Sequence, residues 1–217
     1  MSQIAWQGLL TATDNLGLMV DSQHAIGHRP IAPFTLARAS LFAASRTVWI
    51  LAPSSRRTRQ ERALWANFED VRNLVLLVTE SPRDPSEPGA VAAKAHVESE
   101  LNELKEVALD RLGLVLNSKG KPTDTSIIEA AAAYLDPDDG DERRAIKMLW
   151  RIHSGHAHGL SWPNLLRPPA EGFVGPDGHN YRRQIADRRA FGEAASAAML
   201  MTNAAFNLYD QRVTAHL

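Results

Sequence analysis

The segment FTLARASLFAASRTVWILA, at residues 34–52, is the strongest helical pattern of the chain and decides its fold class. It is rich in alanine, and its apolar residues recur with helical rather than alternating periodicity. Pro33, just before it, suits the first turn of a helix. Pro53 ends the pattern, because proline lacks the amide hydrogen that a helix interior needs. The segment predicts one long helix.

The same periodicity recurs on both sides of this segment. Further helical patterns lie at residues 3–20, 56–80, 90–112, 127–135, 141–158 and 187–213. Between them, SPRDPSEPGA at 81–90 is a linker, and 160–185 is irregular, with a small hairpin expected around GPDG at 175–178. We therefore expect an all-α bundle of six to seven helices forming a single domain over residues 1–217. A subdivision, if there is one, would fall at the 81–90 linker.

Composition narrows the class of protein. Hydrophobic residues make up 44% and charged residues 23%, and the formal net charge of −1 gives no reason to expect non-specific attraction to nucleic acid or to a membrane. Cysteine is absent, which excludes disulfides, thiolate metal sites and cysteine nucleophiles. The N-terminus has no signal-peptide pattern, and the longest apolar runs, such as residues 74–78, are too short to cross a bilayer. These features predict a cytoplasmic protein without a membrane partner.

The chemically active side chains are concentrated in WRIHSGHAHGLSW, residues 150–162. Arg151, Ser154 and His158 are separated by three and four positions and therefore share one face of a helix. An arginine can hold a phosphate by paired hydrogen bonds, and a histidine can move a proton near neutral pH. Together they suit the attack of a ribose 2′-hydroxyl on the adjacent phosphodiester, a reaction that needs no metal.

His156 is the rival of His158 for this proton transfer. It lies about 140° around an ideal helix from Arg151, so it joins the arginine only if the helix unwinds near Gly155 or Gly159. A structural interpretation competes with both: histidines at a helix C-terminus interact favourably with the helix dipole and the free carbonyls. Gly159 is a natural residue to end such a helix.

A metal site is a further alternative for the same stretch. His153 and His156 are three positions apart and can reach one ion, with His158 as a third ligand if the chain turns. The spacing matches no established metal-binding motif, so this remains a hypothesis.

Two other groups of residues have a structural and a functional interpretation. The arginines at 56, 57, 59 and 62 either contact phosphates or lie on a solvated helix start. The tryptophans at 6, 49, 65, 150 and 162 are expected to pack in the core or between helices, although Trp162 is also close enough to the histidines to wall a pocket.

The stretch from Arg151 to His158 resembles the catalytic helix of HEPN-domain proteins. These are small helical bundles whose motif is an arginine followed, after four to six residues, by a histidine. Arg151 to His156 has the shorter spacing and Arg151 to His158 the longer one. The polar residue that commonly follows the motif arginine is replaced here by Ile152.

The chain is also similar to a set of uncharacterised actinobacterial helical proteins. These contain an S-x-x-x-H-G-x-x-W stretch like Ser154 to Trp162. Earlier in these chains, a segment that runs from an arginine to a tryptophan and a leucine, like Arg38 to Leu51, precedes an arginine-rich helix.

The HEPN resemblance implies a metal-independent ribonuclease of toxin–antitoxin or phage-defence type, with RNA as its substrate and no cofactor. It implies a homodimer that brings two motifs together, and an antitoxin or other protein as partner. Arg151 would bind phosphate, His158 or His156 would act as general acid and base, and Ser154 would orient one of them. The alternatives are a non-catalytic helical interaction or regulatory module and a metal-binding protein that uses His153, His156 and His158.

Overall fold

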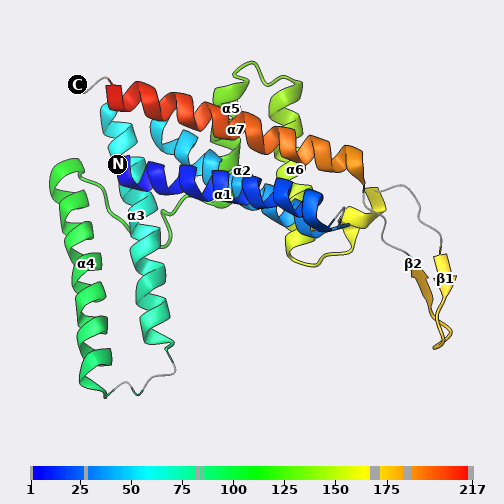
Figure 1. Ribbon diagram of the computed structural model, residues 1–217. Coiled ribbons are helices and arrows are strands. Elements are labelled where there is room, and N and C mark those ends of the chain that lie inside the picture. Colours follow the sequence, from blue (N-terminus) through cyan, green and yellow to red (C-terminus); the bar gives the residue numbers. More distant parts are fainter. Residues whose placement is uncertain are drawn as a thin grey trace.

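The computed structural model describes residues 2–26, 29–81, 84, 86–166, 172–182 and 187–214. In these residues the chain forms seven α-helices, one short 3-10 helix and one two-stranded hairpin, which confirms the all-α class (Figure 1). The elements are α1 (Ser2–Ile26), α2 (Ala32–Leu51), α3 (Arg56–Thr79), α4 (Pro88–Leu112), α5 (Asp124–Leu135), α6 (Asp141–Ala157), η1 (Trp162–Leu166), β1 (Gly172–Val174), β2 (Asn180–Arg182) and α7 (Arg188–Thr214). None of the described helices is both long and apolar enough to cross a membrane.

Helix α2, formed by the segment that opens the sequence analysis, is the centre of the bundle. It contacts α1, α7, α5, α6 and α3. Its apolar residues Leu41, Val48, Ile50 and Leu51 are buried on several sides of the helix, as expected for a helix that neighbours surround. The strongest helical pattern of the sequence thus became the helix on which five others pack.

Helices α1 and α2 approach closely because the residues between them are small. A Cβ atom at Gly8 would lie 2.3 Å from Oγ1 of Thr47, so only glycine fits at this crossing. The Ser40 hydroxyl donates a hydrogen bond of 2.9 Å to the carbonyl of Ala12, and the Thr47 hydroxyl donates one of 3.2 Å to the carbonyl of Ala5. The glycine that weakens α1 as a helix is the residue that lets it dock.

Arginines close the C-terminal end of α2, where backbone carbonyls have no partner in the helix. Arg59 donates to the carbonyls of Pro53 and Ser54 at 2.7 and 2.8 Å. Arg62 donates to the carbonyl of Trp49 at 2.6 Å, and Arg212 of α7 donates to that of Leu51 at 3.3 Å.

The Arg59 side chain is buried in this cluster. Burial lowers the pKa of its guanidinium from the usual value, and the neighbouring charges of Arg212 and Arg56 lower it further. Arg59 is therefore not a solvated residue, as the structural interpretation of the sequence had it, and half-buried Arg62 donates to the end of the same helix. They stabilise the end of the central helix.

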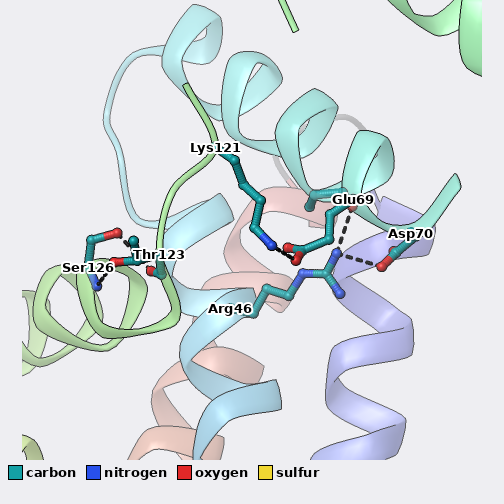
Figure 2. A network of polar contacts seen from close by, with 7 residues as sticks. Arg46, Glu69, Asp70, Lys121, Thr123 and Ser126 are labelled. Carbon is teal, nitrogen blue, oxygen red and sulfur yellow. Dashed lines mark hydrogen bonds and ion pairs between the residues drawn. The ribbon is translucent and has the colours of Figure 1, made fainter. Parts of the chain in front are cut away.

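Helices α3 and α4 form a hairpin that projects from the bundle as an arm (Figure 1). The arm has a small core of its own, built around Phe68, Ala108 and Leu116. At its base, Arg46 of α2 donates to the carboxylate of Asp70 at 2.8 Å and to the carbonyl of Ala66 at 2.7 Å. Figure 2 shows this contact beside the ion pair of Lys121 with Glu69, which ties the loop before α5 to α3. The predicted 81–90 linker, of which residues 82, 83 and 85 lie outside the described residues, falls between the two helices of the arm, but its residues 88–90 belong to α4.

The irregular region predicted at 160–185 contains the hairpin expected around residues 175–178. Strands β1 and β2 pair antiparallel, with Phe173 opposite Tyr181. The turn is closed by a hydrogen bond of 3.0 Å from the Gly178 amide to the carbonyl of Gly175, and Gly178 has φ of 78°. The predicted loop also contains η1, and its residues 167–171 and 183–185 lie outside the described residues.

Candidate functional site at the end of helix α6

Helix α6 carries the stretch singled out in the sequence and ends as predicted. Its last helical residue is Ala157, His158 follows as the cap, and Gly159 adopts a left-handed φ of 68°. The Gly159 amide donates to the carbonyl of His156 at 3.1 Å, and the Leu160 amide donates to that of Gly155 at 2.9 Å. This pair of bonds is the Schellman arrangement, which satisfies carbonyls at the helix end and requires a residue that tolerates positive φ.

Arg151, Ser154 and His158 lie along the outer side of α6. Arg151 and His158 are exposed, and Ser154 between them is half-buried. Within the described part of the chain, neither the Arg151 guanidinium nor the His158 imidazole makes a hydrogen bond or an ion pair. Both side chains are thus accessible to a ligand. We call these three residues, together with Arg38, the α6 strip.

Arg38 of α2 is the residue of this site that the sequence did not indicate as functional. Its Nε donates a hydrogen bond of 3.0 Å to Oγ of Ser154, and its guanidinium carbon lies 4.4 Å from the centroid of the Trp150 ring. Trp150 in turn stacks on Phe42, with ring centroids 5.5 Å apart. Phe34, Arg38 and Phe42 are spaced by four residues, so one stripe of α2 faces α6. That spacing was the available signal, but it does not reveal which helix the stripe contacts.

His153 and His156 lie on the side of α6 that is turned away from Arg151. Their exposed fractions are 2% and 7%, and both imidazoles stack on Phe34 with ring centroids 5.2 Å away. Helix α6 does not unwind at Gly155, so the structure does not bring His156 to Arg151. The histidine on the same face as the arginine is His158, about two turns further along the helix.

The structure does not assemble the alternative metal site. His153 and His156 are buried against Phe34, whereas His158 is exposed at the helix cap, on the face of Arg151. Across the described residues no group of three or more histidine, cysteine, aspartate or glutamate side chains could hold a metal ion.

The loop after α6 covers part of the helix through Gly155. A Cβ atom at Gly155 would lie 2.5 Å from Cγ of Pro163 and 3.0 Å from two atoms of the Trp162 ring. Gly155 is four residues after Arg151 and therefore lies on the same side of α6. Trp162 thus anchors the loop, and its half-exposed ring borders the α6 strip.

The α6 strip combines two guanidinium groups, a hydroxyl and an imidazole beside an indole ring. Arginines bind the oxygens of phosphates, and indole rings stack on bases. Comparison of the chain with protein-family models, with curated proteins and with solved structures gave no match.

Proposed function

We propose that the α6 strip binds a phosphodiester of RNA and that the protein is a metal-independent endoribonuclease of the kind that the HEPN resemblance implies. Arg151 binds a non-bridging phosphate oxygen, and His158 is the general base and acid. Arg38 contributes positive charge from the neighbouring helix. Ser154 has a positioning role, because its oxygen accepts the hydrogen bond that holds Arg38 on the strip.

The chemistry balances without a co-reactant. His158 accepts the proton of a ribose 2′-hydroxyl, and the resulting oxygen attacks the adjacent phosphorus. The bond from phosphorus to the 5′-oxygen breaks, and that oxygen receives a proton from the imidazolium. The products are a 2′,3′-cyclic phosphate and a 5′-hydroxyl end. Two guanidinium groups stabilise the negative charge that builds up on phosphorus-bound oxygens in the transition state.

One observation supports this proposal most directly. The Arg38–Ser154 hydrogen bond places a second guanidinium on the sector of α6 that carries Arg151 and His158. On a helix with 100° per residue, Trp150, Ser154, His158 and Arg151 fall within about 100° of one another. If α6 ended only in a well-capped terminus, Arg151 would be expected to donate to carbonyls or carboxylates. No such bond links it to the described residues.

A non-catalytic interaction module is the second candidate. The contacts of Arg38 favour it, because an arginine that stacks on a buried tryptophan and bonds a serine also serves simply to join two helices. In that case the α6 strip would bind no phosphate, and loss of Arg151 would change nothing measurable.

The test is cleavage of short fluorophore-labelled RNAs by the purified full chain in the presence of EDTA. We expect cleavage, and we expect Arg151→Ala and His158→Ala each to lower its rate by about 100-fold or more. An RNA with a 2′-deoxy nucleotide at the cleaved position should resist. Arg111→Ala and His96→Ala are matched controls, because both side chains are exposed and lie on α4, which packs on α3 rather than on α6.

The outcomes separate the two candidates. Binding of RNA without cleavage, weakened by Arg151→Ala, would leave a phosphate-binding module. Equal cleavage by the wild type and both strip variants would show that a contaminant or another site is responsible. Cleavage products with a 3′-hydroxyl end would contradict the proposed transfer to the 2′-oxygen. Circular dichroism confirms in each case that the variant is folded.

A further inference from the structure

An apolar stripe runs along the outer side of α1. Trp6, Leu10 and Val20 are 44%, 44% and 48% exposed, and Thr13 and Gly17 stand between them at alternating spacings of four and three. This spacing keeps all five positions on one side of the helix, over a length of about 21 Å. The sequence predicted Trp6 as a packing residue, but almost half of its surface is exposed.

A second stripe runs along α7, which lies beside α1 in the opposite direction (Figure 1). Met199 and Val213 are exposed, and Phe206 and Tyr209 between them are partly buried. All four follow the same alternation of three- and four-residue steps, in which the remaining position, Thr202, is buried. The rings of Trp6 and Tyr209 have centroids 5.6 Å apart, so the two stripes meet where the helices touch. We call the combined surface the α1–α7 seam.

The composition of the seam is that of an interface core rather than of an ordinary surface. Scattered exposed apolar residues need no explanation, but here the exposed residues of α1 adjoin the partly buried rings of α7 through Trp6 and Tyr209. Aromatic residues and methionine are enriched and charged residues are depleted at the centres of protein interfaces. The seam contains Trp6, Phe206, Tyr209 and Met199, and no position of either stripe is charged.

The charges beside the seam indicate what covers it. Helix α1 contains no lysine or arginine, and its Asp14 and Asp21 flank the stripe. Asp210 flanks the stripe of α7, whereas Arg212 of the same helix is directed to the carbonyls of Leu51 and Pro53. The border along α1 is therefore acidic, whereas α7 carries both signs, with Arg188 and Arg189 exposed at its N-terminal end. A second copy of this chain would bring aspartates next to aspartates, which is unfavourable.

We propose that the α1–α7 seam is the docking site of an amphipathic helix from a partner protein, with large apolar residues on one face and lysine or arginine along its borders. The apolar face lies over the seam, and its basic borders pair with Asp14 and Asp21 of α1. Helix-in-groove recognition of this kind uses anchors at positions i, i+3 or i+4, and i+7. The same spacing occurs on the seam.

The experiment measures the binding of labelled synthetic peptides to the full chain by fluorescence anisotropy. The probe is a capped peptide of about 18 residues with a leucine face and lysine borders, long enough for about five turns. One control peptide has glutamate in place of lysine, and another has the same composition in scrambled order. We expect the lysine-bordered helix to bind about ten-fold more tightly than either control, with an advantage that falls at high salt.

Variants locate the binding site on the chain. Leu10→Glu on α1 and Met199→Glu on α7 should each weaken binding of the lysine-bordered peptide by about ten-fold, since each puts a charge into the apolar patch. Leu77→Glu, at an exposed position on the arm, makes the same change outside the seam and should leave binding unaltered. Asp14→Lys should reduce the preference for lysine over glutamate borders, and the double variant with Asp21→Lys should remove it, while both variants stay folded by circular dichroism.

Three results would overturn the proposal. The first is equal binding of the lysine-bordered and scrambled peptides, or no binding of either. The second is binding that Leu77→Glu reduces as much as Leu10→Glu does. The third is a dimer in sedimentation velocity that Leu10→Glu converts to a monomer, because a second copy would then occupy the seam.

Discussion

The Nε atom of Arg38 donates a hydrogen bond of 3.0 Å to the Oγ atom of Ser154, a residue 116 positions further along the chain. This bond joins the central helix α2 to the outer helix α6 at the middle of the α6 strip. The same guanidinium lies over the Trp150 ring, which is buried. Arg38 is thus held by a hydrogen bond and a ring contact. Arg151, which lies on the face of α6 that Arg38 contacts, is exposed.

Replacing Arg38 should lower stability, whereas replacing Arg151 should not. We expect Arg38→Met to reduce the free energy of unfolding by about 1–2 kcal/mol, because the hydrogen bond and the contact of the cation with the Trp150 ring are both lost. Arg151→Met should change it by less than about 0.5 kcal/mol, as is usual for an exposed side chain without partners. Urea unfolding followed by circular dichroism measures both. Equal losses would mean that Arg151 has a structural role.

Gly155 should tolerate no side chain, although it lies inside a helix. In Gly155→Ala the new methyl group would meet Pro163 and Trp162, so we expect a loss of about 1–3 kcal/mol or a displaced loop. Gly17→Ala is the matched control, because nothing lies within 4 Å of the added Cβ and the position is also helical. That variant should instead gain about 0.5–1 kcal/mol from helix propensity. Thermal unfolding measures whether each substitution lowers or raises the stability of the protein.

The buried Arg59 should be far more important for stability than its exposed neighbour Arg56. Removal of the Arg59 guanidinium leaves the carbonyls of Pro53 and Ser54 without their donor, and we expect Arg59→Met to cost about 2–3 kcal/mol. Arg56→Met should stay within about 0.5 kcal/mol. The midpoints of urea unfolding give both free-energy changes, provided that the slope m of the transition is the same in the variants and the wild type. A neutral Arg59→Met would indicate that water satisfies these carbonyls equally well.

Most helix boundaries could be predicted from the sequence, because breakers and caps act locally. The pattern at 56–80 became α3 (Arg56–Thr79), capped by Ser55, whose hydroxyl accepts a hydrogen bond of 3.4 Å from the Thr58 amide. The turn at Gly159 was likewise confirmed, because glycine is the residue that most readily adopts the positive φ this turn needs. Local chemistry was sufficient in both cases.

The contacts between helices could not be predicted in the same way. Periodicity shows that Trp6 and Leu10 belong to an apolar face, but not that the bundle leaves this face uncovered. It places Arg38 on a stripe with Phe34 and Phe42, but not opposite Ser154. Each of these facts depends on the order in which helices pack around α2. A single sequence does not encode that order in any short segment.

The stack of two imidazoles on Phe34 yields the last prediction. Phe34 is buried against His153 and His156 and belongs to a small cluster with Met19, so Phe34→Ala should cost about 3–5 kcal/mol. Phe34→Leu retains most of the volume but removes the ring, so its cost should be smaller, about 1–2 kcal/mol.

Proton NMR of the imidazole C–H resonances gives a readout that volume alone does not affect. In Phe34→Leu the ring-current shifts of His153 and His156 should disappear together, because a single ring stacks on both. The resonances of His158, which lies on the opposite side of α6, should not move. A change confined to one buried histidine would mean that the ring does not stack on both imidazoles in solution.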